Sequence, residues 1–447
     1  MIAKSKLNYE LLADDELVIV DGHNDTMMKV VDENTWLPKN NLGKKTDNHI
    51  DIPKLKKSGI NALCFAAYTH GYYGNTAKSI SRTLALINAL YWTESRNQDY
   101  FKIIKFVDEI SKTIKDNKIG AILTIEGGYS LNKENSSELL KQYYDLGVRM
   151  LALTWNYSNE LGEGASRVYG DLSNTPSKGG LTEVGSTVIK EMNKLGMVID
   201  VSHLAENTFW DVIEITKAPV IASHSGVYSL RNHPRNLTDS QLKAIRQNNG
   251  VVGAVLSQNF LKESKEAYIS DYIDHIDYIV NLIGIDYVGI GSDFDGTTLP
   301  LDLNDVSEFY KMVEELKKRG YKKEDLEKIL GINMLRVFRE VENLGINEGN
   351  KSEFSIIPEF KMGEIITNSM SLLSAKIESG NLREIDKRNS KVMIDGFTYV
   401  PKYNEETSTL YLQIPKSLQE KFHVITFEVI DIQGNIKRES RIIYIDF

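Results

Sequence analysis

Six ionisable residues recur at the ends of short apolar runs in this sequence, and their types are those that bind metal ions. They are His23, Asp25, Glu126, His203, His224 and Asp293. His23 and Asp25 lie two positions apart, which places both side chains on one face of an extended chain. Burying so many ionisable groups without partners would cost several kcal/mol each, so a metal site explains them better than packing does. We therefore predict a metal centre.

The ligand types narrow the choice of metal. Histidine and carboxylate ligands without thiolates suit zinc, manganese, cobalt or iron(II), and zinc is the usual choice for hydrolysis at neutral pH. The three histidines with Asp25 and Glu126 make five candidate ligands, more than a mononuclear catalytic zinc normally takes from protein. A two-metal site that shares one carboxylate uses them better, and such a pair activates water and polarises a carbonyl. The predicted reaction class is metal-assisted hydrolysis.

The elements that must position these residues have the pattern of an α/β barrel. Short runs rich in Val, Ile and Leu alternate with segments of helical period, which is typical of βα units. The eight runs are Leu17–Val20, Ile60–Ala66, Gly120–Ile125, Val148–Leu153, Met197–Val201, Pro219–Ala222, Val251–Leu256 and Tyr287–Ile290. Eight such repeats predict a closed (β/α)8 TIM-type barrel, in which functional groups project from the carboxyl ends of the strands. The six residues fall at such ends.

Helical segments are predicted between and after these strands. They are Ser79–Glu94, Phe101–Asn117, Ser137–Leu146, Val184–Leu195, Asp239–Asn248, Ser270–Ile283, Asp305–Lys318 and a closing helix pair over Lys323–Leu344. From about Lys351 the pattern changes to alternating runs without helices, namely Lys391–Ile394, Thr409–Ile414, His423–Ile432 and Arg441–Ile445. This alternation predicts a small all-β, sandwich-like module. We expect a hydrolase domain over 1–350 and a β module of unknown role over 351–447.

Composition limits the partners of the chain. It has 447 residues, with 53 Lys and Arg against 62 Asp and Glu, a formal charge of −9. This balance provides no basic surface for nucleic acid or for an anionic membrane. Cys64 is the only cysteine, which excludes an intramolecular disulfide and any cysteine-based zinc finger. No apolar stretch has the length of a signal peptide or a membrane span, so we expect a cytoplasmic chain without membrane contact.

Several motifs together resemble those of the membrane (renal) dipeptidase family, the binuclear zinc peptidases of the amidohydrolase superfamily. The motifs are Asp21-Gly22-His23-Asn24-Asp25, Ile125-Glu126-Gly127-Gly128, Val201-Ser202-His203, Ala222-Ser223-His224-Ser225, Arg235-Asn236 and Gly291-Ser292-Asp293-Phe294-Asp295-Gly296. Each is weak alone, but six in this order are highly specific. The resemblance covers roughly residues 15–345 and does not extend to the β module.

The resemblance implies a role for each matching residue. Two zinc ions would be bound, one by His23, Asp25 and Glu126 and the other by Glu126, His203 and His224, with Glu126 bridging. Asp293 would handle the proton of the attacking water. Arg235, followed by Asn236, would hold the substrate's terminal carboxylate, for which a guanidinium fork is well suited. The implied activity is hydrolysis of dipeptides, with tolerance for a D-residue at the C-terminal position, by a homodimer.

One position departs from the family pattern. Where several members carry a histidine that stabilises the oxyanion, this chain has Trp155 followed by Asn156. The indole N–H or the Asn156 amide could donate one hydrogen bond to the substrate, but neither replaces a cationic imidazole. We expect oxyanion stabilisation to depend more on the metals.

Two alternative functions stay open at this stage. The same barrel and metals could hydrolyse another small amide or a lactam; Arg235 separates the two, because a dipeptidase should lose binding when the substrate carboxylate is amidated. The chain could also be a non-catalytic, metal-containing binding module, although such a module would have no need of Asp293.

The other histidines are expected on the surface; they are His49, His70, His233, His275 and His423.

Overall fold

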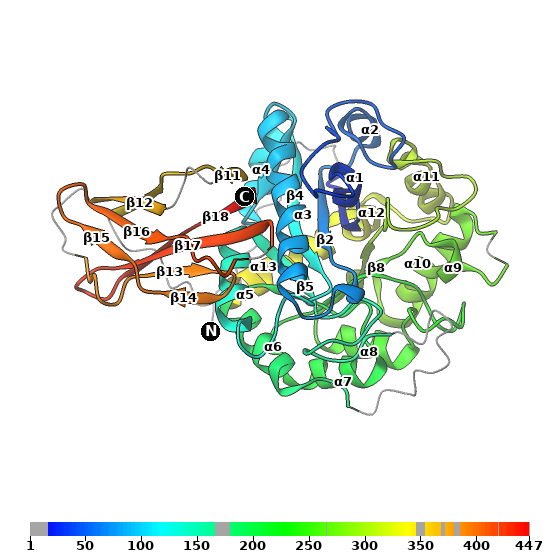
Figure 1. Cartoon of the computed structure of the whole chain (residues 1–447). Coiled ribbons are helices and arrows are strands. Elements are labelled where there is room, and N and C mark those ends of the chain that lie inside the picture. Colours follow the sequence, from blue (N-terminus) through cyan, green and yellow to red (C-terminus); the bar gives the residue numbers. More distant parts are fainter. Residues whose placement is uncertain are drawn as a thin grey trace.

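Eight parallel strands of the computed structural model close into a barrel. The structure describes residues 17–165, 179–264, 266–345, 354–367, 372–379, 385–418 and 420–446. The barrel strands are β1 (Val20–Asn24), β2 (Ala62–Tyr68), β4 (Ile119–Glu126), β5 (Val148–Ala152), β6 (Val198–Asp200), β7 (Ile221–Ser225), β8 (Val251–Ala254) and β9 (Val288–Ile290). Their order is β2-β1-β9-β8-β7-β6-β5-β4, and β4 pairs back to β2. The predicted TIM-type barrel with C-terminal β sheets is confirmed (Figure 1).

Helices follow the barrel strands and bury one face against them. The main ones are α2 (Ile52–Ser58), α3 (Ala77–Arg96), α4 (Asp108–Lys115), α5 (Ser136–Asp145), α6 (Glu183–Leu195), α7 (Glu206–Ile215), α8 (Asp239–Gln247), α10 (Ile269–Ile283), α11 (Tyr310–Lys318), α12 (Lys323–Glu327) and α13 (Asn333–Leu344). α8 shows how the sequence encodes such an element. It begins with a capping box between Thr238 and Gln241 and buries Leu242 and Ile245, so its start and its inner face are both locally specified.

Two parts of the barrel differ from the sequence prediction. The helix predicted over Phe101–Asn117 is wrong at its start, because β3 (Phe101–Ile104) pairs in parallel with the first half of β4 and the helix α4 begins only at Asp108. Within β3 the side chains of Phe101 and Ile103 are buried while Lys102 is exposed, which is the period of a strand. The helix α7 was not predicted.

Two antiparallel-rich sheets form the C-terminal part. One has the order β10-β12-β16-β15 and the other β11-β18-β17-β13-β14. Their strands are β10 (Phe354–Pro358), β11 (Glu364–Thr367), β12 (Leu372–Ser379), β13 (Lys391–Ile394), β14 (Phe397–Tyr399), β15 (Lys402–Asn404), β16 (Thr409–Gln413), β17 (Phe422–Ile430) and β18 (Ile436–Asp446). Side chains from both sheets share one apolar core, including Ile356, Leu373 and Phe427, as in a sandwich. The predicted domain boundary near residue 350 lies outside the described residues.

The sandwich is docked on the barrel through the second face of its larger sheet. Phe422 and Val424 of β17 belong to the barrel's apolar core, whereas Ile425 and Phe427 belong to the core of the sandwich. β17 lies against α3, and β18 lies against α5 (Figure 1). This strand therefore has two buried faces, and eight of its nine residues are buried.

Gln142 of α5 is the polar centre of this contact. Its amide nitrogen donates to the backbone oxygens of Met393 and Val424 and to Thr426 Oγ1, and its oxygen accepts from Gly396 N at 2.6 Å. The side chain is fully buried. Because both the nitrogen and the oxygen of its amide are bonded to the sheet, the residue fixes how the sheet sits on α5.

Substitution of Gln142 is expected to loosen the docked sheet. Gln142→Leu keeps the size of the side chain but leaves the buried Gly396 N–H without its acceptor, so we expect a loss of about 1–3 kcal/mol in the free energy of unfolding. Denaturant unfolding measures this loss. Gln247→Leu on the exposed face of α8 is the matched control and should change the free energy by less than about 0.5 kcal/mol. Equal effects of the two changes would contradict this role.

Candidate active site

The carboxyl ends of five barrel strands bring the six predicted residues together. His23 and His224 lie within β1 and β7, Glu126 is the last residue of β4, and the others follow directly after strands β1, β6 and β9. All six side chains are buried. The sequence placed β1 too early: its apolar run ends at Val20, but the strand continues through the polar residues to Asn24.

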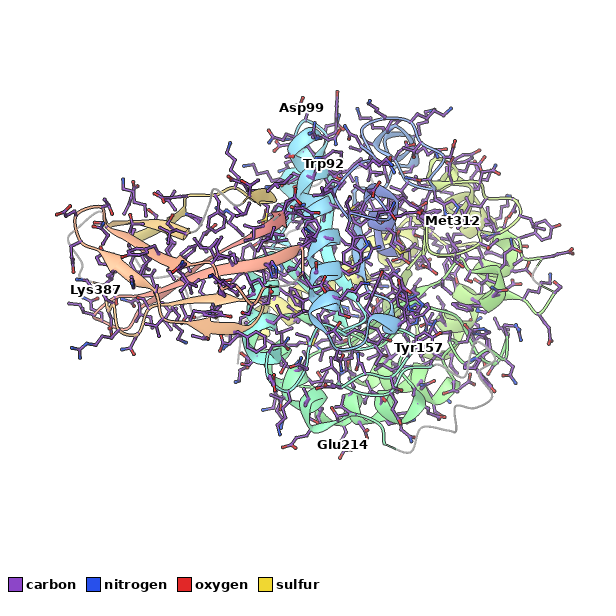
Figure 2. All side chains as sticks on the ribbon, viewed as in Figure 1. Trp92, Asp99, Tyr157, Glu214, Met312 and Lys387 are labelled. Carbon is purple, nitrogen blue, oxygen red and sulfur yellow. The ribbon has the colours of Figure 1, made fainter. Side chains whose placement is uncertain are left out.

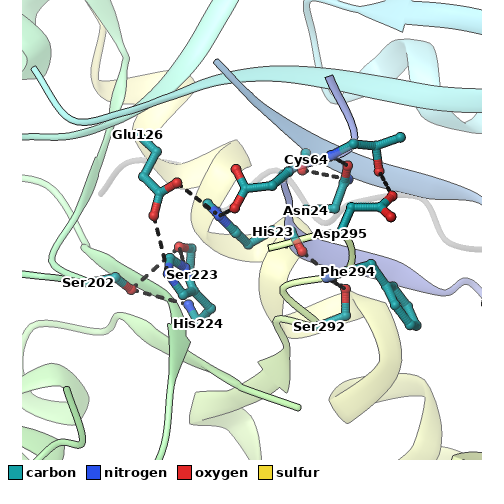
Figure 3. A network of polar contacts seen from close by, with 12 residues as sticks. His23, Asn24, Cys64, Glu126, Ser202, Ser223, His224, Ser292, Phe294 and Asp295 are labelled. Atoms are coloured by element: carbon teal, nitrogen blue, oxygen red, sulfur yellow. Dashed lines mark hydrogen bonds and ion pairs between the residues drawn. The ribbon is translucent and has the colours of Figure 1, made fainter. Parts of the chain in front are cut away.

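Glu126 lies at the centre of this group. Its Oε1 is 2.8 Å from His203 Nε2 and 3.5 Å from His224 Nε2, and its Oε2 is 3.5 Å from His23 Nε2. Asp25 Oδ2 lies 3.9 Å from His23 Nε2. Figure 3 shows the Glu126 carboxylate reaching toward both sides of the cluster. One carboxylate thus joins a His23–Asp25 pair to a His203–His224 pair.

The donor atoms fit bound cations. Within the described residues, His23 Nε2, Asp25 Oδ1 and Glu126 Oε2 are buried without a hydrogen-bond partner. Three sets have ligand atoms within 4.8 Å of one another, namely His23 with Asp25 and Glu126, Glu126 with His203 and His224, and His23 with His224 and Asp293. Buried nitrogen and oxygen atoms in this state carry a free-energy cost that a metal ion removes.

Contacts behind the histidines aim their Nε2 atoms at the cluster. His203 Nδ1 donates to Asn156 Oδ1 at 2.8 Å. Ser223 Oγ donates to Asp200 Oδ2 at 2.5 Å and accepts from His224 Nδ1 at 2.8 Å. With both Nδ1 atoms protonated, the Nε2 lone pairs of His203 and His224 face each other at 2.8 Å. This arrangement is repulsive alone and suits a cation, since metal-binding histidines are oriented in this way.

The electrostatics of the cluster show a deficit of positive charge. Burial would lower the pKa of His23, but the carboxylates of Glu126, Asp25 and Asp293 outweigh it and raise that pKa to about 10. Burial, together with the charge of Glu126, raises the pKa of Asp293 to about 7 against the opposing charges of His23 and Arg235. Burial also raises the pKa of Asp25. Carboxyl groups that resist ionisation in this way are those that a metal ion would hold ionised.

Gly296 allows the backbone to pass beside two of the carboxylates. A Cβ atom at this position would collide with Asp25 Oδ2 and Asp293 Oδ1. Because a close backbone approach of this kind requires glycine, the Gly296 in the motif after β9 has a structural reason.

An alanine at Gly296 is expected to displace both carboxylates. We expect Gly296→Ala to lower activity or metal affinity by about 10- to 100-fold, the range found when groups around metal ligands are disturbed. Metal equivalents per chain and kcat/KM for a dipeptide measure the effect. Gly179→Ala is the control, because its Cβ would meet Glu163 only at 3.6 Å. Unchanged metal content and kcat/KM in Gly296→Ala would show that the loop can move aside.

The residues predicted to contact substrate lie around this cluster. Arg235 is buried in the segment after β7, where its Nη2 donates to the backbone oxygen of His224 at 3.2 Å. The amide of Asn236 is bonded to the backbone of Gly226 and Phe260, among others, and so holds the segment that carries Arg235. Trp155 lies with its ring 6.0 Å from that of His203. Asn156 is fully buried behind His203.

The sequence missed supporting residues and misjudged two histidines. Asp200 ends β6 directly before a quoted motif, and Ser223 lies in β7 within another; these positions beside His203 and His224 were the signal for their role. The surface location predicted for His275 and His423 is wrong, because both are buried. His275 Nδ1 accepts from Val227 N, and His423 Nδ1 lies 2.6 Å from Asp395 Oδ2. Neither belongs to the cluster.

No helix in the described ranges has the length and apolar character required to cross a membrane.

Comparisons with known proteins agree with the site. The family model described as membrane dipeptidase (peptidase family M19) matches residues 11–352. An uncharacterized dipeptidase of Schizosaccharomyces pombe is 32% identical over 351 residues, which are 75% of this chain and 83% of that protein.

Solved structures show the same likeness. A dipeptidase described as a metallopeptidase of family M19 is 28% identical with a TM-score of 0.66, over 73% of this chain and all of that chain. A metallopeptidase from Rhodobacter sphaeroides, bound to a phosphinate mimic of L-Ala-D-Ala, is 27% identical with a TM-score of 0.65, over 73% of this chain and all of that chain. The buried cluster at the barrel mouth and these matches together make the chain a metallo-dipeptidase that belongs to the membrane dipeptidase family.

Proposed function

We propose that the chain is a zinc-dependent dipeptidase with two ions per chain, bridged by Glu126, and that it accepts a D-residue at the C-terminal position. The observation that supports this most directly is the position of the Glu126 carboxylate between the His23–Asp25 pair and the His203–His224 pair. In this proposal each pair holds one ion together with Glu126. Bound zinc would polarise the scissile carbonyl and make water a stronger nucleophile.

Side chains of the protein perform the remaining tasks. The Asp293 carboxylate takes a proton from the attacking water and delivers it to the leaving amine, for which a buried carboxyl group at the barrel mouth is suited. Arg235 binds the terminal carboxylate of the dipeptide. It lies close enough to the cluster that its charge, added to the effect of burial, lowers the pKa of His203 and of His224. The Trp155 side chain lies beside His203, where an indole N–H could donate to the substrate carbonyl oxygen.

The stereochemical part of the proposal is supported by a relative. The Rhodobacter sphaeroides structure holds a mimic of L-Ala-D-Ala. The whole of that chain matches this one, over 73% of the present sequence. A dipeptide with a C-terminal D-residue is therefore the substrate we propose here.

The test is release of free amino acids from L,L and L,D dipeptides, their C-terminal amides and a tripeptide. Zinc-loaded protein is used, with Glu126→Gln as the blank. We expect cleavage confined to dipeptides that have a free carboxylate. Cleavage of the amides at equal rates would contradict the role of Arg235. No cleavage of any peptide by a chain shown to hold zinc would contradict the dipeptidase proposal.

A further inference from the structure

Five ring-bearing side chains form a continuous surface at the end of β2 and on the loops after β2 and β5. We call it the aromatic wall; it consists of Tyr68, His70, Tyr72, Trp155 and Tyr157. The Trp155 ring lies 5.2 Å from Tyr68, 5.0 Å from His70 and 5.7 Å from Tyr157, and the His70 ring lies 4.4 Å from Tyr72. Offset and tilted rings at such distances stabilise one another.

The aromatic wall begins at the metal-binding cluster and ends in solvent. Tyr68 pairs in register with Glu126, and the Trp155 ring lies 6.0 Å from that of His203. At the outer end, Tyr72 is 69% exposed and Tyr157 is 39% exposed. In Figure 2 Tyr157 lies on the barrel, far from Lys387 in the C-terminal sheets. A contiguous apolar surface that opens from an active site is a candidate for ligand contact.

Hydrogen bonds hold the Tyr157 part of the wall in place. Tyr129 Oη donates to the backbone oxygen of Tyr157 at 2.5 Å and accepts from Tyr157 N at 3.2 Å. A Cβ atom at Gly71 would lie 2.9 Å from Tyr157, so the two loops are in direct contact. Burial lowers the pKa of His70, which keeps this ring neutral near pH 7. A preformed, uncharged surface costs little to order when an apolar group binds to it.

The barrel order places the β2 part of the wall opposite Arg235, while Trp155 and Tyr157 follow β5, which only β6 separates from β7. Three strands separate β2 from β7 in either direction around the closed barrel. Arg235 follows β7 and Tyr68 ends β2. The cluster around Glu126 lies between them. An extended dipeptide spans about 7 Å, so a substrate held by its carboxylate at Arg235 extends its other end toward β2 and β5.

We infer that the aromatic wall is the binding surface for the N-terminal side chain of the substrate, and that it selects dipeptides whose N-terminal residue is aromatic or large and aliphatic. This inference rests on the proposed function, because that function orients the dipeptide. Contact with the wall should make kcat/KM for a dipeptide with N-terminal Phe or Leu about 10- to 100-fold higher than for one with N-terminal Gly.

The experiment compares two peptide series with zinc-loaded full-length protein. Phe-Ala, Leu-Ala and Gly-Ala vary the N-terminal residue, whereas Ala-Phe, Ala-Leu and Ala-Gly vary the C-terminal one. In the N-terminal series we expect kcat/KM to be higher for Phe-Ala and Leu-Ala than for Gly-Ala. In Tyr157→Ser and Tyr72→Ser the ratio of kcat/KM for Phe-Ala to kcat/KM for Gly-Ala should fall at least about 3-fold.

Tyr310→Ser is the matched control, because Tyr310 is a 50% exposed tyrosine on the outer helix α11. It should leave the ratio unchanged. Hydrolysis of all dipeptides without discrimination at the N-terminal residue would overturn the inference and leave the proposed function intact. A ratio that is unaffected by both wall variants would also overturn it. No hydrolysis of any dipeptide would refute the proposed function, and the inference with it.

Discussion

Glu126→Gln is expected to abolish metal binding and hydrolysis together. The amide keeps the length of the side chain but removes the charge that faces all three histidines at 2.8 to 3.5 Å. Since each proposed ion shares this carboxylate, the variant should retain no zinc, whereas about two ions per chain are expected in the wild type. Elemental analysis after dialysis measures the zinc, and dipeptide cleavage should fall to the level of chelator-treated protein.

The matched control is a second buried glutamate outside the site. Glu428 in β17 is buried and pairs with Lys391 and Arg438. Glu428→Gln should cost stability but leave zinc content and kcat unchanged, because it lies in the C-terminal sheets. Zinc content and activity that survive in Glu126→Gln would exclude the bridging role. Zinc restoring activity to the chelated wild type, but not to the variant, would support it.

The site was predictable because its residues are close in the barrel for a simple topological reason. The carboxyl ends of parallel strands meet at one face, so each polar residue after an apolar run could be assigned to that face without any knowledge of distances. His23, Glu126 and His224 illustrate this; they come from three strands far apart in sequence, and any two of them share a set whose ligand atoms lie within 4.8 Å of one another.

The sequence could not show where polar residues are buried for structural reasons. His275 accepts a backbone N–H from Val227, and His423 of β17 pairs with Asp395 in the interior. Val227 lies 48 positions from His275, and Asp395 lies 28 positions from His423, so no local pattern reveals these two contacts. β1 was cut short for the same reason. Asp21 and Asn24 look like the end of a strand, but Ser292 and Cys64 satisfy their side chains in the interior.

Short strands at the barrel edge were a second limit. In β3, Phe101, Ile103 and Ile104 fit a helical face as well as an alternating strand, because so short an apolar run does not fix its period. Only the pairing with Ile119–Ile122 decides it. The aromatic wall was invisible for a related reason, since Tyr72 and Trp155 come from loops that meet only when β2 and β5 flank β4.

Asp293→Asn should separate proton transfer from metal binding. The amide cannot take a proton from water, so kcat is expected to fall by about 10²- to 10⁴-fold while zinc content and KM are retained. Steady-state kinetics with zinc analysis measures both. The geometry makes this a real test, because Asp293 also lies within ligand distance of His23 and His224. Loss of zinc in Asp293→Asn would identify it as a ligand instead.

Asp295→Asn provides the comparison from the same turn. Its carboxylate accepts from His49 N at 2.7 Å and from Thr26 Oγ1 at 2.8 Å, so it anchors a neighbouring loop and has no proton to transfer in the reaction. We expect Asp295→Asn to lower the thermal stability while changing kcat much less than Asp293→Asn does. If the two variants lost kcat equally, the effect would come from the shape of the turn, and the proton-transfer role of Asp293 would have to be given up.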